Sequence, residues 1–278
     1  MNAEKPVLTD DEVVAALGHE PVLQRNFSFI SLLGLTFAIL NTWTALSVSM
    51  SLALPSGGPS AVIWGLVVSG VGNLALALSM AEFLSAFPTA GGQYHWAAIV
   101  APPRLKRICS WTTGWINMGG WIALAASGGL LSSELIVGLI ALFHPGYNPQ
   151  RWHQFLIYIA YNVLGFVVNA VATSLLPYTN QASLVWSLTG FAVISITLLS
   201  THKVDFARAR WVFGNVLNQT GWPDGIAWLL GLLQGSFSLT AYDAVTHMIE
   251  EIPNATVQGP RIMVCLLYTS DAADDMQC

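Results

Sequence analysis

The chain has 278 residues, of which 54% are hydrophobic and only 9% charged, with a formal net charge of -5. A soluble domain carries roughly 25% charged residues, so these charges are too few to coat a water-exposed surface. Apolar runs of about 18 residues or more recur, and each is long enough to cross a bilayer core. The composition therefore predicts an all-α polytopic membrane protein, and no basic stripe suggests nucleic acid.

Residues 1–24 form a polar, acidic segment ahead of the first apolar run. Thr9-Asp-Asp-Glu12 has the form of a capping box, which predicts one short helix there. The segment lacks the apolar stretch of a cleavable signal peptide. We interpret it as a cytosolic N-terminal tail, followed by a transmembrane domain over residues 25–262.

The first span runs from Phe27 to about Leu54, and polar residues interrupt its middle at Asn41-Thr-Trp-Thr44. As one straight helix it would be about 40 Å long, more than a bilayer core needs. If the middle unwinds, Thr42 or Thr44 can cap the outer half, whose free amides would then suit an anion. The alternative is an unbroken helix whose Ser and Thr side chains bond back to the preceding turn.

The second span, from about Ala61 to Phe87, carries Glu82 near its end. This residue is either a gating or proton-coupling group, or a carboxylate satisfied by the nearby Gly91-Gly92 amides. A basic loop follows at Pro102-Pro-Arg-Leu-Lys-Arg107. Basic residues beside a span mark the cytosolic side of a membrane, so we expect the N-terminus to be cytosolic as well.

Three further spans are predicted at Cys109–Phe143, Trp152–Leu176 with a turn at Pro177, and Ala182–Leu199. The first of them is rich in small residues, which let helices pack closely in lipid. It also carries Glu134 near its outer end. An intramembrane carboxylate indicates a functional group, but one this close to the surface can also snorkel into water.

The sixth span, from about Pro223 to Glu251, breaks between Gly235 and Asp243. Thr240-Ala-Tyr-Asp243 has the form of a capping box, which predicts that a helix restarts there. Backbone groups freed by such a break are tolerated in a membrane only where they are buried or line a cavity. His247, one turn further on, is a gating or proton-coupling candidate, or else a packed, hydrogen-bonded side chain.

Interrupted spans in corresponding positions of two halves indicate the substrate site of a transporter. We therefore predict that residues from both breaks bind the substrate. They are Asn41, Thr42, Trp43, Thr44 and Ala45 in the first span, and Phe237, Ser238, Leu239, Thr240, Tyr242 and Asp243 in the sixth. The sequence offers no nucleophile–base pair, metal-ligand cluster or phosphate loop, so no catalytic residue, cofactor or metal site is predicted.

The last residues change character abruptly after Val264. Cys265-Leu-Leu-Tyr-Thr-Ser-Asp-Ala-Ala-Asp274 looks like the translation of an adapter used in building sequencing libraries. Scars of this kind are excluded from reasoning about a fold. We interpret residues 265–278 as such an artefact, and we expect the transmembrane domain to be incomplete.

Three stretches together carry a family pattern. They are Asp11–Gly18 with Arg25-Asn-Phe-Ser and Leu33–Ala38, then Ser79-Met-Ala-Glu82 with Phe87-Pro-Thr-Ala-Gly-Gly-Gln-Tyr94, and finally Tyr242–Glu251 with Asn254-Ala and Pro260. On these residues the chain resembles the fungal amino acid, γ-aminobutyrate and choline permeases of the amino acid–polyamine–organocation superfamily. The second stretch is the most specific.

The resemblance implies a LeuT-like fold of five-plus-five inverted repeats, with the solute held between helices one and six. This chain would contain the first repeat and helix six, about six spans in all. The implied function is proton-coupled transport of amino acids or related amines such as γ-aminobutyrate. The alternatives are a choline, quaternary amine or polyamine permease, and a non-transporting nutrient sensor or scaffold. The expected location is the plasma membrane or the vacuolar membrane.

A zwitterionic solute would meet both breaks. We expect its carboxylate at the start of the outer half of helix one, near Thr44 to Leu46, because a helix N-terminus attracts anions. Its ammonium would meet carbonyl groups near Phe237 to Leu239. Trp43 and Tyr242 would flank it, or would bind choline through cation–π contacts.

Overall fold

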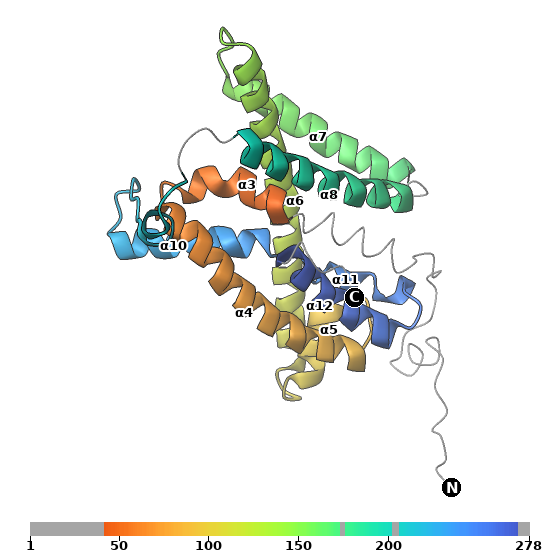
Figure 1. Cartoon of the computed structure of the whole chain (residues 1–278). Helices are drawn as coiled ribbons and strands as arrows, with labels where there is room; N and C mark the ends of the chain where they lie inside the picture. The colour runs from red at the N-terminus through yellow and green to blue at the C-terminus, as the bar shows by residue number, and fades with distance from the viewer. Residues whose placement is uncertain (1–41, 173–175, 202–205, 272–278) are drawn as a thin grey trace. The chain divides into compact units, whose positions relative to one another are not determined.

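The computed structural model describes residues 42–172, 176–201 and 206–271, and every element over these ranges is a helix. The predicted all-α fold is confirmed. The N-terminal tail, Asn41 and the first part of span one lie outside the described residues. In chain order the elements are α3 (Thr42–Ala53), α4 (Gly58–Ala86), α5 (Gly92–Val100), α6 (Lys106–Phe143), α7 (Arg151–Val171), α8 (Leu176–Thr201), α9 (Ala209–Gly214), α10 (Asp224–Ser238), α11 (Ala244–His247), the 3-10 helix η2 (Ile249–Glu251) and α12 (Ala255–Asp271) (Figure 1).

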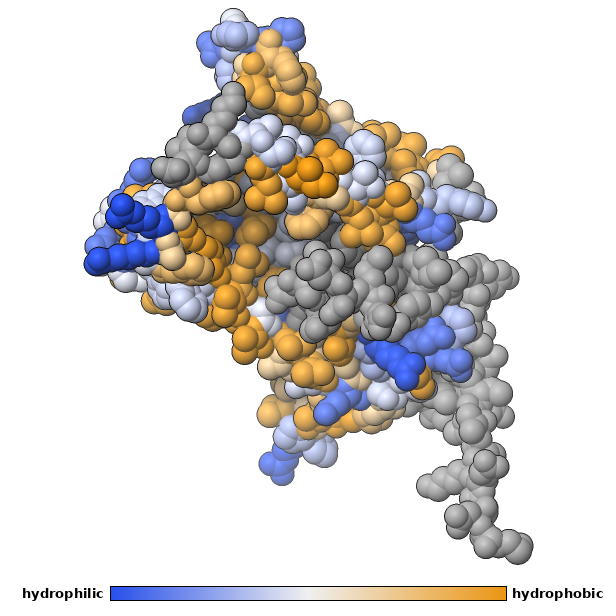
Figure 2. Space-filling view, in the orientation of Figure 1, coloured by the Kyte–Doolittle hydropathy of each residue, from blue (hydrophilic) through white to orange (hydrophobic). Residues whose placement is uncertain are grey.

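Four of the described helices are long and apolar enough to cross a membrane: α4, α6, α7 and residues Tyr178–Thr201 of α8. Many large apolar side chains of these helices are exposed on the surface of the protein. Phe166 on α7 is 73% exposed and Trp186 on α8 is 82% exposed, and apolar side chains cover much of the visible face (Figure 2). Exposing such an apolar surface to water is unfavourable, whereas lipid solvates it. The predicted polytopic membrane architecture is confirmed.

The chain divides into two compact units, residues 97–179 and the remainder. In the first unit, α6 packs against α7. The helices approach closely at Gly129, where an added Cβ would lie 2.6 Å from the side-chain nitrogen of Asn162. Gly129 therefore serves helix contact, as the sequence predicts for small residues of this span, whereas an added Cβ at Gly119, Gly120, Gly128 or Gly138 would meet nothing within 4 Å.

In the second unit, α4 packs against α10 and α12, and α3 packs against α10. Buried apolar side chains from α4, α5, α11 and α12 join those of the stretch that follows α10 to form one core. Its members are Ala77, Ala81, Leu84, Trp96, Leu239, Tyr242, Val245, Ile249, Ile252, Ala255, Ile262 and Met263. The break in the sixth span and the helices that follow it thus share one packed core.

Two helix boundaries differ from those predicted. The second span, expected from about Ala61, begins three residues earlier, because α4 starts at Gly58. Gly57 and Gly58 both adopt positive φ, which glycine alone adopts without strain. Pro177 lies in the first turn of α8 rather than in a turn after span four. A proline is tolerated there because the first turn of a helix has no amide partner to lose.

Candidate functional site

The sixth span is broken as predicted. Helix α10 ends at Ser238, α11 begins at Ala244, and residues 239–243 between them are not helical. Hydroxyl groups compete for the last carbonyls of α10: Ser238 Oγ donates to Gly235 O at 3.0 Å, and Thr240 Oγ1 donates to Phe237 O at 2.9 Å. Such local bonds favour the end of a helix over its continuation.

The backbone at this break is strained. Ala241 has φ of 71°, a left-handed conformation that costs a residue with a Cβ about 1–2 kcal/mol. Packing must supply this free energy, and Ala241 is indeed buried next to core residue Tyr242. Strain of this kind collects at functional sites, where the surrounding structure imposes it.

The predicted capping box does not form. Asp243 precedes α11 but makes no side-chain cap, and the Thr240 hydroxyl is committed to the carbonyl of Phe237. Thr240 and Asp243 have the residue types of a capping box, but in the fold each side chain binds another partner. The carboxylate of Asp243 instead faces α5.

The first span does not unwind over the residues that the structure describes. Thr42, Trp43, Thr44 and Ala45 all belong to helix α3, while Asn41 lies outside the described range. The serines of α3 bond back to preceding carbonyls, as Ser47 Oγ does to Trp43 O at 2.7 Å. The alternative of a continuous helix therefore describes residues 42–53, and the unwinding predicted at 42–44 is wrong.

Two hydrogen bonds between α3 and the α10 region define the direction of the pair. Ser56 Oγ, just beyond α3, donates to Ala227 O at 2.9 Å, and Gln234 Nε2 donates to Leu46 O at 2.7 Å. The helices are consequently antiparallel. The Thr42 end of α3 and the Ser238 end of α10 lie toward the same end of the pair, which brings the two predicted parts of the site to one level.

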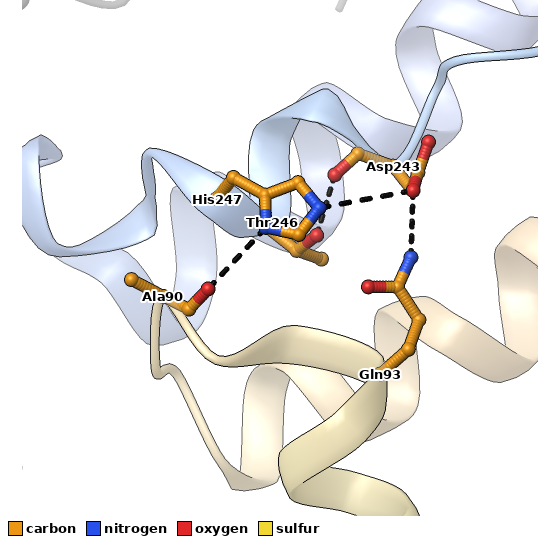
Figure 3. Close-up of polar contacts among 5 residues, drawn as sticks. All are labelled: Ala90, Gln93, Asp243, Thr246 and His247. Atoms are coloured by element: carbon orange, nitrogen blue, oxygen red, sulfur yellow. Dashed lines mark hydrogen bonds and ion pairs between the residues drawn. The ribbon is translucent and has the colours of Figure 1, made fainter. Parts of the chain in front are cut away.

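A polar cluster joins the sixth-span break to the turn between α4 and α5 (Figure 3). Gln93 Nε2 donates to Asp243 Oδ2 at 2.7 Å, and His247 Nε2 lies 3.9 Å from the same oxygen. His247 Nδ1 lies 3.3 Å from Ala90 O. The Thr246 hydroxyl closes the first turn of α11 onto the carbonyl of Asp243. Asp243 is thereby held by one neutral donor and by one histidine at longer range.

Glu250 holds the same turn from the other side. Its Oε1 accepts a hydrogen bond from the Ala90 amide at 2.8 Å. One of the two interpretations of Glu82 was a carboxylate satisfied by the Gly91-Gly92 amides of this turn, but Glu82 is exposed on α4. That interpretation of Glu82 is wrong, because the resumed half of span six, and not α4, faces the turn. The gating role of Glu82 stays a prediction.

The two predicted flanking aromatics, Trp43 and Tyr242, have different surroundings. Trp43 Nε1 donates to Ser187 Oγ of α8 at 2.9 Å, and its ring lies 6.2 Å from that of Phe191. Tyr242 is buried in the core with Leu239. No ring contact joins Trp43 and Tyr242 among the described residues, so the structure does not bring the two predicted flanking aromatics together.

Glu134 belongs to the other unit. It is exposed on α6, and Gln154 Nε2 of α7 lies 3.5 Å from its Oε1. Both interpretations of Glu134, a functional intramembrane carboxylate and a side chain that snorkels to the surface, stay predictions.

Sequence reasoning left Gln93, Gln234 and Glu250 without a role. Gln93 and Glu250 both belong to the motifs quoted for the family resemblance. The signal that could have found Gln93 is its place directly after Gly91-Gly92, because a polar residue beside a tight glycine turn is presented in a fixed direction. Its partner was beyond reach of the sequence, since Gln93 and Asp243 are 150 positions apart.

Gly92 carries a prediction about the stability of this cluster. Its φ is 47°, and an added Cβ would lie 3.2 Å from the Thr246 hydroxyl oxygen. We expect Gly92→Ala to lower the thermal stability of the purified protein by roughly 1–2 kcal/mol. Gly72→Ala on α4, where nothing lies within 4 Å, is the matched control. An unchanged melting temperature for Gly92→Ala would show that the turn is not constrained as described.

Comparisons with known proteins agree with this architecture. A family model described as amino acid permease matches residues 27–267. A Macrophomina phaseolina protein, provisionally named an amino acid/polyamine transporter, is 36% identical over 85% of this chain and 52% of its own length. The choline transporter of Saccharomyces cerevisiae is 34% identical over 87% of the chain and 43% of its own length. An amino-acid permease of Arabidopsis thaliana is 32% identical over 95% of the chain and 53% of its own length.

The chain spans about half the length of the curated relatives it matches. No solved structure matches it significantly.

Proposed function

Because this chain belongs to the amino acid permease family, we propose that it is part of a secondary active transporter for amino acids or related amines such as γ-aminobutyrate, driven by proton symport. The family is one of transporters and not of enzymes. The observation that carries the proposal is the carboxylate of Asp243 beside the break between α10 and α11. A charge at a helix break in a membrane domain indicates a solute or ion pathway.

The charge of Asp243 supports an amino-bearing solute. Its side chain is 21% exposed, and its ion-pair partner among the described residues is His247 at 3.9 Å. No lysine or arginine pairs with it over those ranges, so its negative charge is not cancelled by a fixed cation. The ammonium group of the solute meets this carboxylate and the carbonyls that end α10, while a solute carboxylate lies toward the Thr42 end of α3.

The runner-up is a permease for choline, another quaternary amine or a polyamine. It is favoured by the names of two relatives, one a choline transporter and the other provisionally an amino acid/polyamine transporter. In that case Trp43 contributes a cation–π contact and the Thr42 end of α3 has no solute carboxylate to bind. A third possibility, a nutrient sensor on the same helices, predicts binding without uptake.

The proposed arrangement in the cell is a cytosolic tail over residues 1–24, a transmembrane domain over residues 25–262 in the plasma membrane, and a non-native segment over residues 265–278. The basic loop at Arg104–Arg107 supports a cytosolic N-terminus. Long-read sequencing of the source transcript across Arg261 tests whether residues 265–278 are non-native. A natural message that encodes the printed residues up to Cys278 would overturn it.

Uptake of radiolabelled amino acids, γ-aminobutyrate and choline into cells or proteoliposomes tests the function directly. The transcript-derived, natural-length protein is the one to assay. A proton-coupled permease is expected to accumulate one of these solutes, and to lose accumulation when a protonophore collapses the proton gradient. Binding of a solute without uptake would support a sensor and overturn the transport proposal.

Competition separates the solute classes. If the solute is a zwitterion, analogues that lack the carboxylate should compete about tenfold or more weakly, because they lose a charge-assisted contact. If the loss of the carboxylate never weakens competition, the amino acid assignment is wrong and the choline or polyamine assignment stands.

A further inference from the structure

The hydrogen-bond donor to the Asp243 carboxylate among the described residues comes from a different motif and a different helix. Gln93 lies in the first turn of α5, and its Nε2 donates to Asp243 Oδ2 at 2.7 Å. Figure 3 shows the Gln93 side chain reaching from the α4–α5 side of the cluster toward Asp243. No hydrogen bond to Asp243 Oδ1 is formed by any described residue.

The chemistry of this partner is informative. A lysine or arginine in its place would neutralise the carboxylate and occupy it as a permanent ion pair. A glutamine amide donates a hydrogen bond but carries no net charge. It fixes the orientation of the carboxylate while leaving the negative charge available to another cation.

The position of Gln93 is itself fixed. Gly92 before it has φ of 47° and packs against Thr246 of α11. Glu250 binds the amide of Ala90 at 2.8 Å, and Trp96 Nε1 donates to Phe87 O at 3.1 Å. The turn is therefore tied both to the resumed half of span six and to the core, so the Gln93 amide is presented to Asp243 in a defined direction.

We propose that Gln93 is a positioning residue of the solute site: it occupies one oxygen of Asp243 and so reserves the other for the amino group of the transported solute. This inference rests on the proposed function, in which Asp243 meets that group. It adds a specificity element, because a carboxylate held at one oxygen offers a single directed acceptor. Primary and secondary ammonium groups, which can donate a hydrogen bond, profit from such an acceptor more than a quaternary ammonium does.

The variants Gln93→Leu and Gln93→Glu separate positioning from mere packing. Gln93→Leu removes the donor at similar size. Gln93→Glu is ionised at neutral pH and places a second negative charge beside Asp243, whereas at acid pH the two carboxyls share a proton and a donor is restored. Rescue of the second variant by acid is therefore specific to the hydrogen bond.

Other titratable groups lie on the elements that carry or adjoin the pair, and the wild type measured at each pH accounts for them. They are Tyr242 and His247 beside and within α11, Glu250 and Glu251 on η2, Tyr94 and His95 on α5, Glu82 on α4 and Arg261 on α12. All of them remain in both variants, so a pH effect seen only in Gln93→Glu arises from the new carboxyl group.

The experiment measures initial uptake of the identified solute by the natural-length protein at about pH 7.5 and about pH 5, relative to wild type at the same pH. We expect both variants to lose about tenfold or more in uptake near neutral pH, since a hydrogen bond to a charged group is lost. Gln93→Glu should return to within roughly threefold of wild type at acid pH, while Gln93→Leu should not. KM should rise more for a primary amine than for its quaternary analogue.

The matched control is Gln154→Leu, which removes another glutamine amide from a carboxylate, that of Glu134, and should leave uptake unchanged. Equal loss for both Gln93 variants at both pH values, or no loss in either, would overturn the positioning role while the transport function stands. A wild type that moves no amino-bearing solute under any condition would overturn the proposed function and, with it, this inference.

Discussion

Gly235→Ala in α10 is expected to abolish recovery of a folded, monodisperse protein. An added Cβ would lie 2.3 Å from the carbonyl carbon and oxygen of Gly65 and 2.6 Å from the amide nitrogen of Leu66. These are main-chain atoms of α4, so no side chain can move aside. The two helices would have to separate, and overpacking of this kind costs about 3 kcal/mol or more.

Whether Gly235→Ala lowers or raises the stability of the protein tests the close crossing of α4 and α10. In an open helix, alanine is favoured over glycine by about 1 kcal/mol, so the substitution stabilises unless packing forbids it. Gly225→Ala, in the first turn of the same helix and with nothing within 4 Å, should therefore keep or raise the melting temperature. Size-exclusion chromatography of the detergent-purified variants measures both. A monodisperse Gly235→Ala protein with wild-type stability would refute the close crossing of α4 and α10.

Under the proposed function the crossing of α4 and α10 matters because it sets the position of the break. Ser69 on α4 and Ser236 on α10 share a hydrogen bond at 2.9 Å, one turn beyond the contact of Gly65 with Gly235. The first half of span six is thereby fixed to α4 just before its last residues. A shift of α10 would move the carbonyls that end it relative to Asp243.

Asp243→Asn is expected to lower uptake of an amino-bearing solute by about tenfold to a hundredfold, because a charge-assisted contact to the solute is lost. Folding should be retained. The asparagine oxygen can still accept the hydrogen bond from Gln93, which lies 2.7 Å from the present carboxylate. Loss of uptake with an unchanged melting temperature and membrane level is the expected combination.

Asp224→Asn is the control for this variant. Asp224 is an exposed carboxylate in the first turn of α10, and it accepts a hydrogen bond from Asn218 Nδ2 at 2.8 Å. The Asp224→Asn variant makes the same chemical change on the same span but away from the break, so its uptake should stay near that of the wild type. Equal uptake by Asp243→Asn and wild type would remove Asp243 from the solute site.

The sequence alone was sufficient to predict that this chain is a polytopic membrane protein. Sparse charge and long apolar runs require lipid as a solvent, and the comparison with known families confirms the permease assignment. The break in the sixth span could also be predicted. A helix is weakened locally by backbone entropy and by side chains that compete for its carbonyls, as expected for Gly235, Ser236, Ser238 and Thr240. These effects depend only on residues close together in sequence.

Tertiary structure decided which groups meet at that break. Asp243 was expected to cap a helix, yet it binds Gln93, and the turn that one interpretation paired with Glu82 binds Glu250 instead. Both outcomes depend on contacts between residues about 150 positions apart. A local pattern states what a side chain can do with its neighbours in sequence. The packing of α4, α5 and the resumed half of span six determines which partner it has, because a buried polar group takes the nearest donor or acceptor that the fold supplies.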